Sequence, residues 1–211
     1  MDKCFFFMMF LLLMIPFKGF SQQEKMQAVE AMKIKDSIIQ KSKSTKTIVG
    51  NFIQTKHLDF LSNDIKSSGY LVFKSPNLIK WEYKKPFKYS IIFKNDKLFI
   101  NDDGDKSKMD VGSNKTFRSL NDLIIKSVKG NMFDDKMFTI QYFKNTSNYI
   151  IQFSTKDVDL KAFINDFILS FDKMTLEVVE IKMMENSEDY TKIRFFDQKI
   201  NVKVDEAVFS N

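Results

Sequence analysis

The segment 69–86 reads GYLVFKSPNLIKWEYKKP and has the pattern of two strands joined by a tight turn. Proline and asparagine follow one another at 76–77, which is typical of a turn. After this turn, Ile79, Trp81 and Tyr83 fall on one side of the chain and polar residues largely fall on the other. Alternation with a period of two predicts an antiparallel hairpin with one buried face.

The same alternation recurs along most of the chain, with turn residues every 8 to 12 residues, which indicates an antiparallel sandwich or barrel. We expect about eleven strands. They are expected among twelve candidate segments, which are residues 48–55, 69–74, 78–83, 89–94, 98–101, 106–111, 137–143, 149–155, 167–172, 176–183, 191–197 and 201–204.

Two segments have helical spacing instead. In residues 23–44 the apolar stripe contains Met26, Val29, Met32 and Ile38, so an amphipathic helix is expected to cover the sheet. The second segment is 116–130, which ends at a glycine and places Phe117, Leu120, Ile124 and Val128 on one side. This helix either forms a movable lid over an open barrel or completes a fixed core.

The N-terminus has the pattern of a secretory signal peptide. Lys3 precedes an unbroken apolar run at 4–17, and small residues at 19 and 21 mark a cleavage site before Gln22. The run is too short for a stable transmembrane helix, although an uncleaved anchor is the alternative. The lone Cys4 lies at the start of the run, where a lipid-modified cysteine is not expected. We therefore expect a signal peptide at 1–21 and a single exported domain at 22–211.

Composition limits the function classes. The formal net charge is +6, and acidic and basic residues are interspersed without dense basic runs, so nucleic-acid binding is not indicated. The mixed charges suit either a solvated surface or a rim that faces anionic headgroups. The 23 phenylalanines and 12 methionines are compatible with an adaptable apolar binding surface and equally with a phenylalanine-rich core.

The order of these features resembles the outer-membrane lipoprotein carrier family, the LolA-type carriers. The most specific stretch is Ser75 to Trp81, with its Pro-Asn-x-x-x-Trp spacing. The resemblance extends from the first helix and strand (Gly50, Phe52) to the closing segment 191–209. It implies a mainly β fold, an incomplete, half-open antiparallel β-barrel with helices forming a lid over a hydrophobic cavity.

The resemblance also implies a function. Family members take triacylated lipoproteins from an inner-membrane exporter and pass them to an outer-membrane acceptor. For this chain it implies a monomeric periplasmic carrier that needs no cofactor, binds acyl chains and binds no nucleic acid. Trp81 is either a ligand contact or a structural anchor. The residues expected to line the cavity or lid are Phe52, Leu71, Phe73, Ile79, Trp81, Phe93, Phe99, Leu120, Ile124 and Val128.

One position departs from the family pattern. Well-characterised members carry an arginine before the motif proline, where it bonds to the lid, and this chain has Ser75. A hydroxyl cannot replace a guanidinium fork, and the adjacent Lys74 is expected to point to the opposite face. The latch is therefore absent or built differently, and packing alone is one way to hold the closed state.

The sequence offers no candidate for catalysis. His57 is the sole histidine and stands at the end of a predicted strand, which suits a surface or turn residue better than a metal ligand. The acidic residues at 102, 103 and 105 resemble the start of a calcium loop, but Ser113 occupies the position of its final glutamate. We expect a charged turn there, and no metal site.

Two other functions fit the same pattern. One is a carrier for a different lipid, such as a phospholipid or a lipidic precursor. The other is a periplasmic protein that binds lipids or envelope proteins without transporting them, for which a collapsed interior would be expected.

Overall fold

The computed structural model describes residues 23–95, 97–110, 126, 132–185 and 188–210. In these residues, twelve strands form one antiparallel sheet. The strands are β1 (Glu24–Lys25), β2 (Thr47–His57), β3 (Ile65–Lys74), β4 (Leu78–Lys85), β5 (Tyr89–Lys94), β6 (Lys97–Asp102), β7 (Asp105–Asp110), β8 (Phe138–Lys144), β9 (Asn148–Thr155), β10 (Asp166–Asp172), β11 (Val178–Met184) and β12 (Tyr190–Ile200). The helices are α2 (Ala28–Ser44), the short α4 (Val158–Lys161) and the 3-10 turn η2 (Glu206–Phe209).

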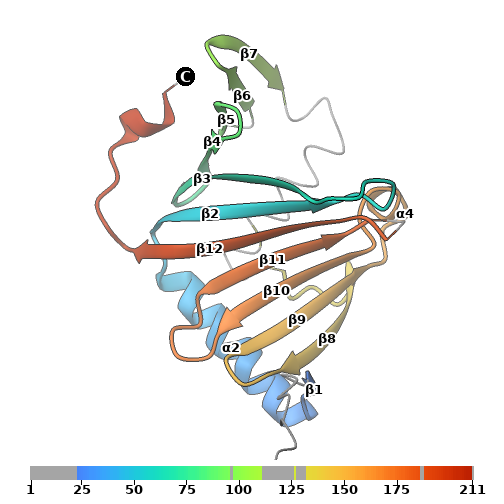
Figure 1. Cartoon of the computed structure of the whole chain (residues 1–211). Coiled ribbons are helices and arrows are strands. Elements are labelled where there is room, and N and C mark those ends of the chain that lie inside the picture. Colours follow the sequence, from blue (N-terminus) through green and yellow to red (C-terminus); the bar gives the residue numbers. More distant parts are fainter. Residues whose placement is uncertain (1–22, 96, 111–125, 127–131, 186–187, 211) are drawn as a thin grey trace, which may run out of the picture.

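The sheet is curved and open. Its order is β1-β8-β9-β10-β11-β12-β2-β3-β4-β5-β6-β7, so β1 and β7 are its two edges. Figure 1 shows the strands β4 to β7 turning upward from the layer formed by β2, β3 and β8 to β12. The expected half-open antiparallel barrel is confirmed. The expected signal peptide lies outside the described residues, and of the expected helix at 116–130 only residue 126 lies within them.

The register of the β3–β4 hairpin follows the alternation in the sequence. Leu71 pairs with Trp81, and Phe73 pairs with Ile79, so these four side chains share the face that packs against α2, which we call the inner face. A Cβ at Gly69 would lie 2.0 Å from the carbonyl oxygen of Glu82. The strand therefore requires glycine at this point of close approach.

The helix α2 lies against the inner face of the sheet (Figure 1). Its buried residues are Ala31, Ile34 and Ile38, at the helical spacing of three and four that places them on one side. The predicted stripe was correct at Met26 and Ile38, which are buried, and wrong at Val29 and Met32, which are exposed. The predicted start was also early, since 24–25 form β1 and the helix begins at residue 28.

The opposite, outer face carries a smaller apolar cluster. Val72 of β3 and Ile92 of β5 pack with Phe209 of η2. The C-terminal segment thus crosses the outer side of the sheet, as Figure 1 shows. The strand predicted at 201–204 is wrong. These residues have no strand structure, and Asp205 caps the 3-10 turn that follows by accepting the N–H of Ala207 at 2.9 Å.

Candidate functional site

The inner face contains an apolar pocket beneath the C-terminal end of α2. The pocket has a volume of about 70 Å³ and lies between α2, β2 to β4 and the ends of β10 to β12. Its main apolar lining consists of Ile48, Leu71, Trp81, Val178, Ile181 and Phe195. The polar side chains of Lys41, Glu177 and Gln198 also border it.

A second depression lies farther along the same face, toward the ends of β4 and β5. It is an open groove of about 740 Å³ bordered by Ile65, Tyr83, Phe87, Tyr89 and Ile91, among others. The Tyr83 ring lies 5.0 Å from Phe52 and 6.0 Å from Tyr89, measured between centroids. Tyr83 and Phe52 therefore separate the groove from the pocket.

The volumes decide what each space can hold. The pocket is about half the size of the roughly 150 Å³ apolar cavity that admits benzene in a protein core, so it cannot take an acyl chain without rearrangement. The groove is large enough for part of such a chain. An acyl chain could use the whole inner face only if α2 or the side chains beneath it move.

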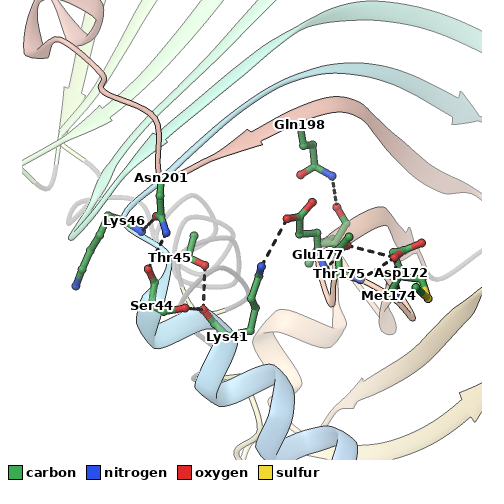
Figure 2. Close-up of polar contacts among 11 residues, drawn as sticks. Lys41, Ser44, Thr45, Lys46, Asp172, Met174, Thr175, Glu177, Gln198 and Asn201 are labelled. Carbon is green, nitrogen blue, oxygen red and sulfur yellow. Dashed lines mark hydrogen bonds and ion pairs between the residues drawn. The ribbon is translucent and has the colours of Figure 1, made fainter.

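Polar contacts hold the end of α2 at the pocket (Figure 2). Lys41 Nζ lies 3.6 Å from Glu177 Oε1, which links the helix to the turn between β10 and β11. The Asn201 side chain donates to the carbonyl of Ser44 at 3.1 Å and accepts the N–H of Lys46 at 2.7 Å. The helix is thus tied to the sheet at its C-terminal end by one ion pair and by one side-chain amide.

The β10–β11 turn that carries Glu177 has its own internal bonds. Asp172 accepts the backbone N–H groups of Met174 and Thr175, each at 2.9 Å. These bonds, led by the one from Thr175, hold the pKa of the Asp172 carboxyl below its usual value. Gln198 donates to the carbonyl of Val178 at 2.9 Å and fixes the first residue of β11 (Figure 2). Hydrogen bonds therefore hold in place the β10–β11 turn and the start of β11, which border the pocket.

Trp81 stands in an aromatic environment inside the pocket. Its ring lies 5.1 Å from Phe52 in an edge-to-face arrangement and 6.0 Å from Phe195. The side chain is only 5% exposed, and its indole nitrogen is fully buried with no hydrogen-bond partner among the described residues. Leaving a buried donor unsatisfied costs about 1–3 kcal/mol.

Six of the predicted cavity residues lie together in the inner-face cluster. They are Phe52, Leu71, Phe73, Ile79, Trp81 and Phe93. Of these, Leu71 and Trp81 line the pocket. Leu120, Ile124 and Val128 lie outside the described residues, so their role in a lid stays a prediction.

The placement of Phe99 with the other cavity residues was wrong. The β5–β6 hairpin pairs Phe93 with Leu98 and Ile92 with Phe99. Phe99 therefore lies on the outer face beside Ile92, whereas Leu98 is buried in the inner-face cluster. The two-residue connection at 95–96 fixes this register, so the sequence contained the signal.

Sequence reasoning missed the pocket residues from the C-terminal half. Phe195 is one of them, and it reaches the pocket because β12 pairs with β2, with Phe195 opposite Phe52. Alternation in β12 is visible in the sequence, but its pairing with a strand near the N-terminus is not. Ile38 of α2 was assigned to the helix stripe and not to the cavity that it lines.

The region around Ser75 is built without the family arginine. The N–H of Ser75 donates to the carbonyl of Lys46 at 2.8 Å. Lys74 points to the outer side, where its amine lies 3.1 Å from Glu206, as predicted. The contact between Lys41 and Glu177 shows that packing is not the sole link between α2 and the sheet.

The other residues considered as catalytic or metal-binding candidates are His57 and the acidic residues near 103, and they take part in local contacts and a turn. His57 Nδ1 is 2.8 Å from Asp64 Oδ1, and the imidazole stacks on Tyr190. Asp103 and Gly104 form the turn between β6 and β7, both with positive φ. The described residues contain no group of three or more acidic, histidine or cysteine side chains that could hold a metal ion. None of their helices has the length and hydropathy needed to cross a membrane.

Comparison with known proteins shows which family this chain resembles. Residues 43–211 match the model of the family described as "Outer membrane lipoprotein carrier protein LolA". An outer-membrane lipoprotein carrier protein of Francisella philomiragia is 28% identical over 185 residues, which is 82% of each chain.

Solved structures share the fold at low sequence identity. The Mycobacterium tuberculosis lipoprotein LppX superimposes with a TM-score of 0.51 at 11% identity, over 85% of this chain and 100% of that one. MucB superimposes with a TM-score of 0.52 at 9% identity, over 87% of this chain and 63% of MucB. The match of the family model extends over most of the chain, and the chain therefore belongs to the LolA family of outer-membrane lipoprotein carrier proteins.

Proposed function

We propose that this protein is a periplasmic carrier that holds the acyl chains of lipoproteins against its inner face and moves them from the inner to the outer membrane. The observation that carries the proposal is the apolar pocket beneath α2, in a chain of the carrier family. A monomer receives the lipoprotein from an inner-membrane exporter and delivers it to an outer-membrane acceptor. No covalent step is required.

The driving force for cargo binding is the removal of acyl chains from water. Each buried methylene contributes about 0.8 kcal/mol. The inner face between β2 and β5 offers apolar and aromatic surface for this contact, in both the pocket and the groove. Release to an acceptor requires that part of this gain is offset by rearrangement of the carrier.

The end of α2 is the element whose movement would open the pocket. Its link to Glu177 is a single partly exposed ion pair, of a kind that contributes about 0–1 kcal/mol. Ile38 covers the pocket from the helix side and is 3% exposed. Displacing this turn of α2 would break this ion pair and the hydrogen bond from Asn201 to Ser44, and would widen the pocket.

A second candidate function rests on the small size of the pocket. A volume of about 70 Å³ also suits a protein whose inner face stays closed, and which binds a lipid or an envelope protein at its surface without transporting it. A carrier of another lipid would use the same inner face as the proposed lipoprotein carrier.

The test is a binding comparison with protein purified after export of the full chain. The ligands are a triacylated lipopeptide, the same peptide without acyl chains, and phospholipid in detergent. The proposal predicts tight binding of the acylated peptide alone. Equal or tighter phospholipid binding would indicate a different lipid cargo, and no binding of any ligand would support the non-transporting function.

A further inference from the structure

The indole N–H of Trp81 is a buried donor in an apolar pocket. The side chain is 5% exposed, lines the pocket, and has no hydrogen-bond partner for its nitrogen among the described residues. Buried tryptophan N–H groups usually have a partner. An unsatisfied donor on a side chain that lines a pocket marks a place where an entering ligand can supply the acceptor.

The surroundings of Trp81 restrict the chemistry of that acceptor. Phe52 and Phe195 flank the indole ring, and Leu71 is its cross-strand partner. A carboxylate or phosphate placed among these side chains would lose its hydration without a paired cation. Lys41 is the one cation among the described residues that border the pocket, and it already lies 3.6 Å from Glu177. A neutral carbonyl oxygen is the acceptor that suits this environment.

We propose that Trp81 donates its indole N–H to the carbonyl oxygen of a fatty-acyl ester when cargo occupies the pocket. This inference rests on the proposed function and specifies the chemical class that the site distinguishes, an acyl ester against a plain hydrocarbon chain. The polar side chains at the pocket border would lie on the headgroup side of the ester, and the aromatic side chains on the side of the acyl chain.

The test compares two lipopeptides that differ only in the linkage. One carries two palmitoyl ester chains on an S-glyceryl cysteine, and the other carries two hexadecyl ether chains, which have no carbonyl. We expect the ester form to bind roughly tenfold more tightly, the ratio for one buried hydrogen bond. Because Trp81 is the sole tryptophan, its 15N-labelled indole gives one NMR signal, which should move downfield with the ester form only.

Two variants separate the hydrogen bond from packing. Trp81→Phe removes the N–H, and we expect it to bind both lipopeptides with a ratio near one. Phe195→Leu alters the same pocket without removing a donor and should keep the ester preference. If Trp81→Phe fails to fold, benzothienylalanine at position 81 replaces the N–H with sulfur in a ring of the same shape.

The outcomes distinguish the role of Trp81 from acyl-chain binding itself. Equal binding of ester and ether forms by the native protein, with an unchanged indole signal, would overturn the role of Trp81 and leave acyl-chain binding intact. Binding of neither lipopeptide would overturn both.

Discussion

The two halves of the inner face are packed differently. Around β8 to β10, Phe138, Phe153 and Phe167 are at most 2% exposed, and the Phe153 ring contacts two other phenylalanine rings at 5.7 Å. Around β2 to β5 and β11 to β12 the same face retains a pocket, an open groove and an indole N–H without a partner among the described residues. We call these the closed half and the open half.

This difference suggests a division of tasks within one sheet. Dense aromatic packing in the closed half stabilises the fold, so the open half can remain incompletely packed. Incomplete packing is what a reversible acyl site requires, because a filled core would have no room for a chain. The predictions below test whether stability and binding separate in this way.

The largest effect is expected from Phe153→Ala in the closed half. Phe153 is 0% exposed, and a truncation of this kind destabilises by about 3–5 kcal/mol. Phe195→Ala in the open half should cost clearly less, because Phe195 is partly buried and borders an existing cavity. Urea unfolding of both variants provides the measurement, and equal losses would contradict the division into halves.

Filling the pocket should weaken binding more than folding. Val178→Phe adds a ring at a residue that lines the pocket, and we expect lipopeptide affinity to fall by roughly tenfold or more while the protein stays folded, with a stability loss within the range of about 1–3 kcal/mol for overpacking. Val158→Phe, at a residue that is 82% exposed, is the matched control and should change neither. Undiminished binding in Val178→Phe would place the acyl chains elsewhere.

Breaking the link between α2 and the sheet should alter kinetics more than stability. Glu177→Gln removes the ion pair with Lys41, and we expect a stability change of about 1 kcal/mol or less together with faster uptake and release of a fluorescent lipid. The control is Glu180→Gln, whose partner Arg194 lies 3.9 Å away across the neighbouring strand. If both variants exchange lipid at the native rate, α2 is not the gate.

A pH dependence, seen only in alkaline solution, is expected from Tyr83 in the open half. Burial, and to a lesser extent Tyr89, raises the pKa of Tyr83 to about 12. The folded state therefore keeps this proton between pH 10 and 12 while the unfolded state loses it. The contribution to stability is complete below pH 10 and falls as pH rises through that window.

Tyr83→Phe provides the comparison, because it lacks the titrating group and also the 2.9 Å hydrogen bond to Gln54. The native free energy of unfolding should decline more steeply than that of the variant above pH 10. Tyr142, whose pKa burial and Asp135 raise to about 12, contributes equally to both proteins. Parallel declines would show that Tyr83 is ionised in the folded state.

Most strands and hairpins could be predicted from the sequence, but fewer of the residues that line the pocket could be. Alternation located most strands to within a few residues, because most strands have one buried face and a period of two. The exceptions are β1 and β7, which are exposed throughout. Alternation also placed Leu71 and Trp81 on one face, since the turn at 75–77 is short. The error at Phe99 came from not carrying the hairpin register from Phe93 to Leu98.

The pocket itself depends on contacts between distant parts of the chain. Phe195 meets Phe52 through the pairing of β12 with β2, and Ile38 reaches the same place from α2. Alternation says which residues share a face of a strand, but not which strands are neighbours. The empty space and the unpartnered nitrogen of Trp81 result from three-dimensional packing, so no local pattern predicts them.

The most direct test of the central claim is to locate the acyl chains by photo-crosslinking. A lipopeptide with a diazirine on one acyl chain is bound to the protein, irradiated, and mapped by mass spectrometry. Adducts in β2 to β5 and β11 to β12, around Leu71, Trp81 and Phe195, are the result that the open half predicts. Adducts confined to the outer face or to β8 and β9, with the open half unlabelled, would contradict it.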